Sequence, residues 1–337
     1  MTNSDPPDQA LPRPRGAISI RPAPGVRRTT SIDVVWPQGR RGGMCLLGQG
    51  RDIQTLDAHV PPTLLAHEHL RLDLGPDRKV LAVLASPKQL VLDRLVGPGQ
   101  EVRAALRSLL EAGSLEHTPV YQLADDMPGV MVVADWAWSR WPDLVDPDET
   151  VRRRTKLSKM EGVCIGFRPG SSALATAGAY QDAMAVEVPL LYHPDDPYGW
   201  HSMSEFAEVS LRRARCIDVW RSGERLQIEA YFQDSGTAPD GRRIAVHEYT
   251  IHAHADWLAG TLLDVHATPH VLPFPECRGA VDRMHALLGL QIESLRTAVP
   301  DLLGRTRGCT HLNDALRALA DVPRLARQLM LGTGSGD

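Results

Sequence analysis

Residues 27–34 read RRTTSIDV, and residues 212–219 read RRARCIDV. Both stretches start with an arginine pair, end in Ile-Asp-Val and contain residues that favour strands. Two further blocks agree in order and approximate spacing: residues 65–69 (LAHEH) match 245–249 (AVHEY), and residues 84–87 (LASP) match 266–269 (HATP). Three collinear blocks indicate an internal duplication.

The duplication predicts an α+β fold. Each unit would be an antiparallel meander of about four strands followed by two helices, and the units would pack as a pseudo-two-fold pair. The expected strands of the first unit are 27–36, 44–56, 64–74 and 80–85, and its expected helical segments are 100–112, 119–126 and 130–141. In the second unit, a helix at 279–288 and the segment 308–311 fall where 100–110 and 116–119 fall in the first.

Composition divides the chain into five parts. The units are expected at 26–141 and 206–331, after a proline-rich, disordered lead at 1–25. Residues 142–205 have no counterpart in the repeat, and a long polar and aromatic connection is typical of a lid or binding loop. The Gly/Ser-rich residues 332–337 are expected to be frayed.

The overall composition indicates a globular cytoplasmic protein. The chain has 337 residues, 43% of them hydrophobic, and a formal net charge of -4, which gives no signal for nucleic acid or membrane. The number of cysteines, 5, is odd and there is no Cys-x-x-Cys pair, so we expect reduced thiols. Dinucleotide, P-loop and serine-hydrolase motifs are absent, so no nucleotide cofactor is expected. The expected partner is a small molecule, and a homo-oligomer is compatible with the composition.

The segment 308–319, GCTHLNDALRAL, brings several reactive groups to the start of an amphipathic helix. We expect Thr310 to be the N-cap, with Cys309 and His311 beside it. The positive end of a helix lowers the pKa of a thiol and favours anions, so this is where chemistry is expected.

The arginine pair, the His-Glu pair, Pro275-Glu276-Cys277 and Gly308-Cys309-Thr310-His311-Leu312 together resemble a bacterial family catalogued as domain of unknown function 2889. The second unit carries this signature, over roughly 212–329. Some relatives in that family belong to catabolic pathways for aromatic or polycyclic compounds, so the resemblance implies a catabolic lyase.

Acid–base chemistry would use groups of the second unit. His247 or Glu248 would act as base, and His311 or Cys309 would assist at the helix start. On a strand only one residue of the His-Glu pair can face a site, and the plainer interpretation is a hydrogen-bonded surface histidine. Asp218 is either a carboxylate in the cleft between the units or one half of a structural arginine ion pair.

The connection and the second arginine pair offer substrate-binding groups. Arg168, Ser171 and Ser172 combine a guanidinium with two hydroxyls, which suits a carboxylate or phosphate, although a plain turn explains them equally well. Arg213 is a further candidate for holding a negative group, and His201 lies at the end of the lid-like connection.

Cys277, Cys309 and His311 are the candidate metal ligands, with His247, Glu248 or Asp218 available as a fourth. A second resemblance, to iron–sulfur scaffold proteins of the NifU type, involves Asp218, Cys277 and Cys309, but the third cysteine of that pattern is missing. The plainer interpretation is that both cysteines are small buried residues in the core.

We therefore expect a small-molecule enzyme, a lyase with acid–base chemistry on an organic substrate, for which an aromatic compound is one candidate. The alternatives are a metal or iron–sulfur handling protein that uses Cys277, Cys309 and His311, and a non-catalytic binding protein.

Overall fold

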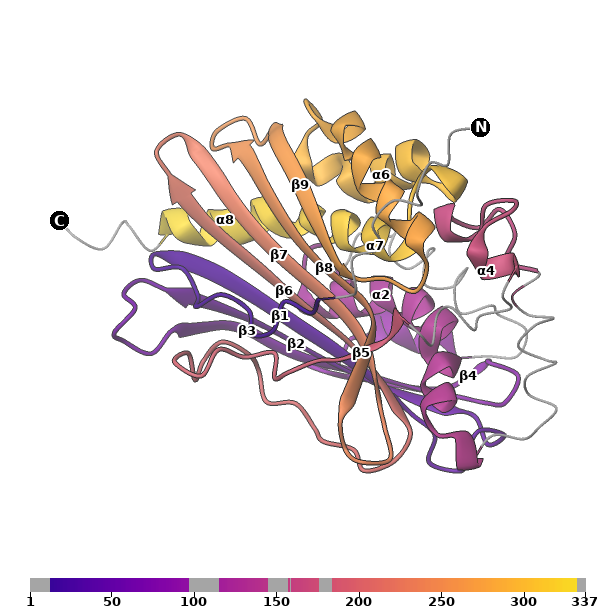
Figure 1. Ribbon diagram of the computed structural model, residues 1–337. Coiled ribbons are helices and arrows are strands. Elements are labelled where there is room, and N and C mark those ends of the chain that lie inside the picture. The colour runs from indigo at the N-terminus through magenta and orange to yellow at the C-terminus, as the bar shows by residue number, and fades with distance from the viewer. Residues whose placement is uncertain (1–12, 97–114, 145–156, 158, 176–183, 332–337) are drawn as a thin grey trace, which may run out of the picture.

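The computed structural model describes residues 13–96, 115–144, 157, 159–175 and 184–331. These residues form an antiparallel sheet of nine strands with helices packed over one face, which confirms the α+β class (Figure 1). The strand order is β4-β3-β2-β1-β6-β7-β8-β5, and β9 also pairs with β8. None of the described helices is long and apolar enough to cross a membrane.

The strands lie close to where the sequence predicts them. The first four are β1 (Gly25–Val35), β2 (Met44–Thr55), β3 (Thr63–Leu74) and β4 (Val80–Ser86). The later ones are β5 (Val186–Glu187), β6 (Ser210–Ser222), β7 (Arg225–Thr237), β8 (Arg243–Asp256) and β9 (Leu262–Val271). Because β1 pairs with β6, two consecutive meanders meet at the middle of the sheet.

The helices differ more from expectation. Thr118 caps α2 (Pro119–Val133), which continues through Pro128 and joins two segments that were expected to be separate. The α-helices α4 (Ser172–Ala175), α6 (Leu295–Leu303), α7 (Thr310–Ala318) and α8 (Val322–Leu331) follow. The helix expected at 279–288 is a 3-10 helix, η5 (Pro275–Leu287), and the helix expected at 100–112 lies outside the described residues.

Shorter 3-10 helices connect these elements: η1 (Leu90–Leu95), η2 (Ala134–Arg140), η3 (Pro142–Leu144), η4 (Ile165–Phe167), η6 (Ile292–Ser294), η7 (Arg305–Arg307) and η8 (Leu319–Asp321).

The core lies mainly between the sheet and the helices. Under α2 it contains Ile32, Leu46 and Leu123, and under α6, α7 and α8 it contains Phe232 and Leu316. Burial of these apolar side chains stabilises the fold, because each removes apolar surface from water. The same packing fixes where each helix starts above the sheet.

The opposite face of the sheet is covered by parts of the chain that were expected to be irregular. Ile18, Leu191 and Trp200 pack there against Cys216 and Tyr231. The composition predicts residues 13–24 to be disordered, but these residues lie along the sheet, because burial of Ile18 holds them there. Residues 1–12 and 332–337 lie outside the described part.

Two reciprocal ion pairs join β1 to β6. Arg27 donates to both carboxylate oxygens of Asp218, at 2.7 and 2.6 Å, and Arg212 donates to both oxygens of Asp33, at 2.7 and 3.1 Å. The partners lie directly opposite each other in the ladder, and all four side chains are buried. Asp218 therefore has the structural role that the sequence left open.

The two His-Glu pairs face opposite sides of the sheet, which corrects the block alignment. His247 lies opposite Asp234, whereas the residue opposite Asp52 is Ala66, not His67. Both carboxylates accept hydrogen bonds from an arginine of the neighbouring strand, so the ladders resemble each other at Asp52 and Asp234 and not at the two His-Glu pairs. The sequence blocks are thus shifted by one residue, and in a strand such a shift reverses the face.

We expect Asp218→Ala to lower the free energy of unfolding by about 3–5 kcal/mol, because it leaves the buried Arg27 without its carboxylate. Urea unfolding measures the loss. Asp240→Ala, which removes an exposed partner of Arg242, is the control and should leave the midpoint nearly unchanged. Equal effects of the two substitutions would contradict the structural role of Asp218.

Candidate functional site

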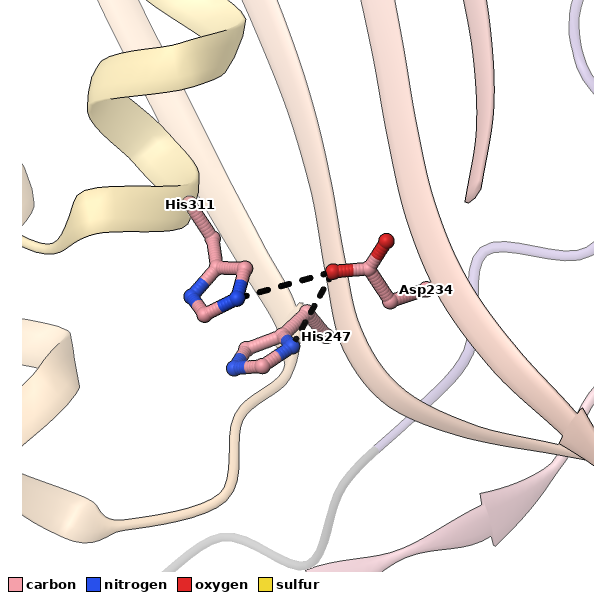
Figure 2. Close-up of side chains that lie close together, drawn as sticks. All are labelled: Asp234, His247 and His311. Carbon is pink, nitrogen blue, oxygen red and sulfur yellow. Dashed lines mark ion pairs between the residues drawn. The ribbon is translucent and has the colours of Figure 1, made fainter. Parts of the chain in front are cut away.

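The side chains of Asp234, His247 and His311 meet on the helix-covered face of the sheet (Figure 2). Asp234 on β7 and His247 on β8 lie directly opposite each other in the ladder and both point toward the helices. His311 is the second residue of α7, and its ring lies over that of His247. Two strands and one helix start therefore build the centre, which we call the Asp-His-His centre.

The two imidazoles share one carboxylate oxygen. Their ring centroids are 3.5 Å apart and the planes differ by 20°. His247 Nδ1 lies 3.3 Å and His311 Nε2 lies 3.6 Å from Asp234 Oδ2. The geometry at His247 is not that of a hydrogen bond, and Nδ1 has no hydrogen-bond partner among the described atoms. The carboxylate thus lies close to both rings without satisfying the buried nitrogen of His247.

Arginine fixes the position of the carboxylate. Arg213 donates to Asp234 Oδ1 at 2.8 Å and to Oδ2 at 3.0 Å, and it also donates to Asp314 of α7 at 3.0 Å. Although burial opposes ionisation, the Arg213 guanidinium holds the pKa of Asp234 well below its ordinary value. Burial, with the nearby His311, lowers the pKa of His247 to about 4. The centre therefore combines a carboxylate with a neutral His247 near pH 7.

Two cysteines adjoin the centre. Cys309 is the residue before α7 and is buried. Interaction with the Cys277 thiol, and then with His311, lowers the pKa of Cys309, while the same interaction raises the pKa of Cys277. We expected Thr310 to be the N-cap, but Cys309 holds that place and Thr310 is exposed, as the first residue of the helix.

The segment around η4 closes the cysteine side of the centre. A Cβ on Gly166 would lie 2.8 Å from Cys277 Sγ and 3.7 Å from Cys164 Sγ, so glycine is needed for this close approach. The backbone N–H of Ile165 donates to the carbonyl of Gly308 at 2.9 Å, directly before Cys309. Part of the lid-like connection is thus attached to the helix that carries His311.

The structure brings together only some of the predicted site residues. His247, His311, Cys309, Cys277 and Arg213 gather at the centre. Glu248 does not, because it points to the other face, where Tyr231 and Gln233 donate to it. Asp218 also lies on that other face, in its pair with Arg27. Arg168 is exposed, and Ser172 donates to Glu276 through its N–H and its hydroxyl, both at 2.8 Å, next to the buried Ser171.

His201 also lies on the face away from the centre. Its Nδ1 is 2.9 Å from the hydroxyl of Thr29, and its Nε2 is 2.8 Å from the hydroxyl of Ser31. Burial, together with the positive charges of Arg51 and Arg212, lowers the pKa of His201 to about 3. The side chain fills a polar gap beside β1.

Sequence reasoning missed Asp234. The carboxylate lies in the stretch QDSG before a turn, and nothing in that stretch indicates a site. The available signal was the ladder register, which places Asp234 opposite Arg213 as it places Asp52 opposite Arg28.

A cavity of about 540 Å³ lies elsewhere, between the β1–β2 turn, the β3–β4 turn and the segment η2–η3. Its lining includes Trp36, Arg40, Arg78 and Asp135, and none of its lining residues belongs to the Asp-His-His centre. Within the centre, the side chain of His311 is the most exposed, at 13%, against 4% for His247.

Fold and site define an α+β protein with a buried carboxylate–imidazole centre. Residues 211–324 match the model of a family described as "Protein of unknown function (DUF2889)", which confirms the resemblance for the C-terminal half. The matched range contains Asp234, His247, Cys309 and His311. No curated protein and no solved structure matches the chain.

Acid should destabilise the protein partly through His201. The unfolded chain takes up a proton at a pKa of about 6.5, whereas the folded protein does so only at about 3, so stability is lost as the pH falls below about 6.5. Between about pH 8 and about pH 5 this group accounts for about 2 kcal/mol. Urea unfolding at both values should show a smaller pH dependence in His201→Gln than in the wild type. The exposed control His266→Gln should keep the wild-type dependence, and an unchanged slope in His201→Gln would contradict the assignment.

Proposed function

We propose that the protein is a small-molecule enzyme, a lyase that transfers protons at the Asp-His-His centre. One observation carries the proposal: a buried carboxylate faces two stacked imidazoles at the start of a helix. An imidazole can act as a general acid or a general base, and an adjacent carboxylate can orient its ring. The positive end of α7 favours a negatively charged substrate group.

The exposures assign the roles. His311, the most exposed of the three, would contact the substrate, with His247 behind it and Asp234 orienting both rings. In the elimination, a base removes a proton from a substrate carbon, and the freed electron pair forms a carbon–carbon double bond. The leaving group departs with its bonding pair and takes up a proton. The reaction needs neither a nucleotide nor an added water.

The substrate class and the compartment belong to the same proposal. The family resemblance is the ground for an organic catabolic substrate, with an aromatic compound as one candidate, and the described structure offers titratable groups for acid–base chemistry. All five cysteines are free and buried, which supports a reducing, cytoplasmic compartment.

We also propose that the two meanders arose by duplication and form a pseudo-two-fold pair. The ladder of β1 and β6 supports this, because Arg27 opposite Asp218 and Arg212 opposite Asp33 are the same contact made twice in reverse. A two-fold axis through the middle of this ladder would place the Arg27–Asp218 pair on the Arg212–Asp33 pair. The working centre would belong to the second half alone, since Ala66 holds the place of His247 in the first.

A metal or iron–sulfur handling protein is the second candidate function. The observation in its favour is that Cys309 interacts with Cys277 on one side and with His311 on the other, and that Cys277 also interacts with Cys164. Asp218 is not available to such a site, because it lies on the other face of the sheet with Arg27.

Lyase activity can be tested without a known substrate. Purified protein is incubated with a small-molecule extract of aromatic-degrading bacteria, and mass spectrometry follows each compound. We expect the wild type to consume a compound and form two products whose masses sum to that of the substrate. His311→Gln should lose this turnover at least about 100-fold, as expected for a group that transfers a proton.

The control is His266→Gln, which changes an exposed histidine 3.1 Å from Asp264, and it should keep the activity. Product masses that sum to the substrate plus one water would identify a hydrolase instead. Turnover by His311→Gln at the wild-type rate would remove His311 from the mechanism.

A further inference from the structure

The donor atoms of the Asp-His-His centre have the spacing of metal ligands. Two ligands about 2.0–2.1 Å from a tetrahedral zinc ion are about 3.3 Å apart. His247 Nδ1 and His311 Nε2 lie 3.3 and 3.6 Å from Asp234 Oδ2, and all three donors are within 4.8 Å of one another. In the part of the chain that the structure describes, no other set of three such residues meets this limit.

We propose that Asp234, His247 and His311 bind one divalent transition-metal ion. Two imidazoles and one carboxylate are a recurrent three-ligand set for zinc and for ferrous iron, and they leave a position for water or substrate. The set differs from the one expected from sequence, since Asp234 and His247 replace the two cysteines. The metal would be a cofactor of the chain, not its cargo.

An unsatisfied buried atom supports the site independently of the spacing. His247 is 3% exposed, and its Nδ1 has no hydrogen-bond partner among the described atoms, although it faces a carboxylate. A buried polar atom left in this way costs free energy. An ion between Nδ1 and Oδ2 would give this nitrogen the partner that it lacks.

The surrounding charges can accept a cation. Arg213 and Arg215 are balanced by three carboxylates, those of Asp126, Asp234 and Asp314. Arg317 shares Asp314 and continues this network through Asp125, Arg296, Asp321 and Arg28 to Asp52. Five guanidiniums therefore face six carboxylates, and the network has a net charge of about -1 before histidines or thiols are counted. Arg213 also orients the Asp234 carboxylate, as hydrogen-bonding partners of metal ligands commonly do.

This inference deepens the proposed function but does not stand or fall with it. A bound ion would polarise a substrate oxygen and so assist the elimination. Metal binding without turnover would support the site and contradict the lyase, whereas full turnover in the metal-free protein would support the lyase and show that the ion is not its cofactor.

The test uses the full chain purified without a histidine tag and treated with a chelator. Equilibrium dialysis against zinc sulfate, followed by elemental analysis, should give one zinc per chain. His247→Gln, His311→Gln and Asp234→Asn should each weaken zinc binding by about 10-fold to 100-fold or more. His266→Gln, which removes an exposed histidine next to Asp264, should bind zinc like the wild type.

Thermal unfolding provides a second readout, in case a variant of the buried His247 does not fold. Zinc should raise the midpoint of the wild type, and it should not raise that of His311→Gln, which changes a residue at the edge of the centre.

Three results would overturn the proposal. The first is an absence of stoichiometric zinc in the wild type, and the second is equal binding by the wild type and His311→Gln. The third comes from cobalt substitution: a thiolate charge-transfer band that disappears in Cys309→Ser would show that sulfur is a ligand and that our ligand set is wrong.

Discussion

The fold depends on arginine–carboxylate pairs buried inside the sheet. Arg27 and Arg212 pair across the β1–β6 ladder, and Arg28 and Arg213 pair with Asp52 and Asp234 toward the helices. A buried guanidinium without its carboxylate raises the free energy of the folded state. An alternative register of the central strands would separate these ion pairs and is therefore disfavoured. The ion pairs therefore specify the order of the strands as well as their alignment.

The same constraint positions the centre. Arg213 donates to Asp234 on β7 and to Asp314 on α7, so one guanidinium joins the strand carrying the carboxylate to the helix carrying His311. Phe232 packs against this guanidinium at 4.8 Å and keeps its plane fixed. The distance between the imidazoles and the carboxylate thus follows from a contact that also stabilises the fold.

The sequence predicted the strands because β1 is rich in β-branched residues and the end of β3 alternates leucine with charged residues. It named His247, His311 and Cys309 as candidates because they stand in short motifs. It could not place Asp234, whose role depends on the ladder partner, nor distinguish His247 from Glu248. Successive side chains of a strand point to opposite faces of the sheet. Whether His247 or Glu248 faces the helices therefore depends on the register of β8 against β7, which shifts between Asp234 and Ser235. Such non-local contacts leave no mark in a single sequence.

The unequal halves explain why one centre would be enough. In the first half, Asp52 keeps its arginine, but Ala66 lies across the ladder, and Pro119 at the start of α2 lies over Gly50. A proline and an alanine offer neither protons nor metal ligands, so the carboxylate of that half is purely structural. In the second half, His247 and His311 stand in place of the alanine and the proline, so Asp234 has partners that can transfer protons or bind a metal. The paired arginine is thus common to both halves, and the histidines alone separate a structural ion pair from a candidate site.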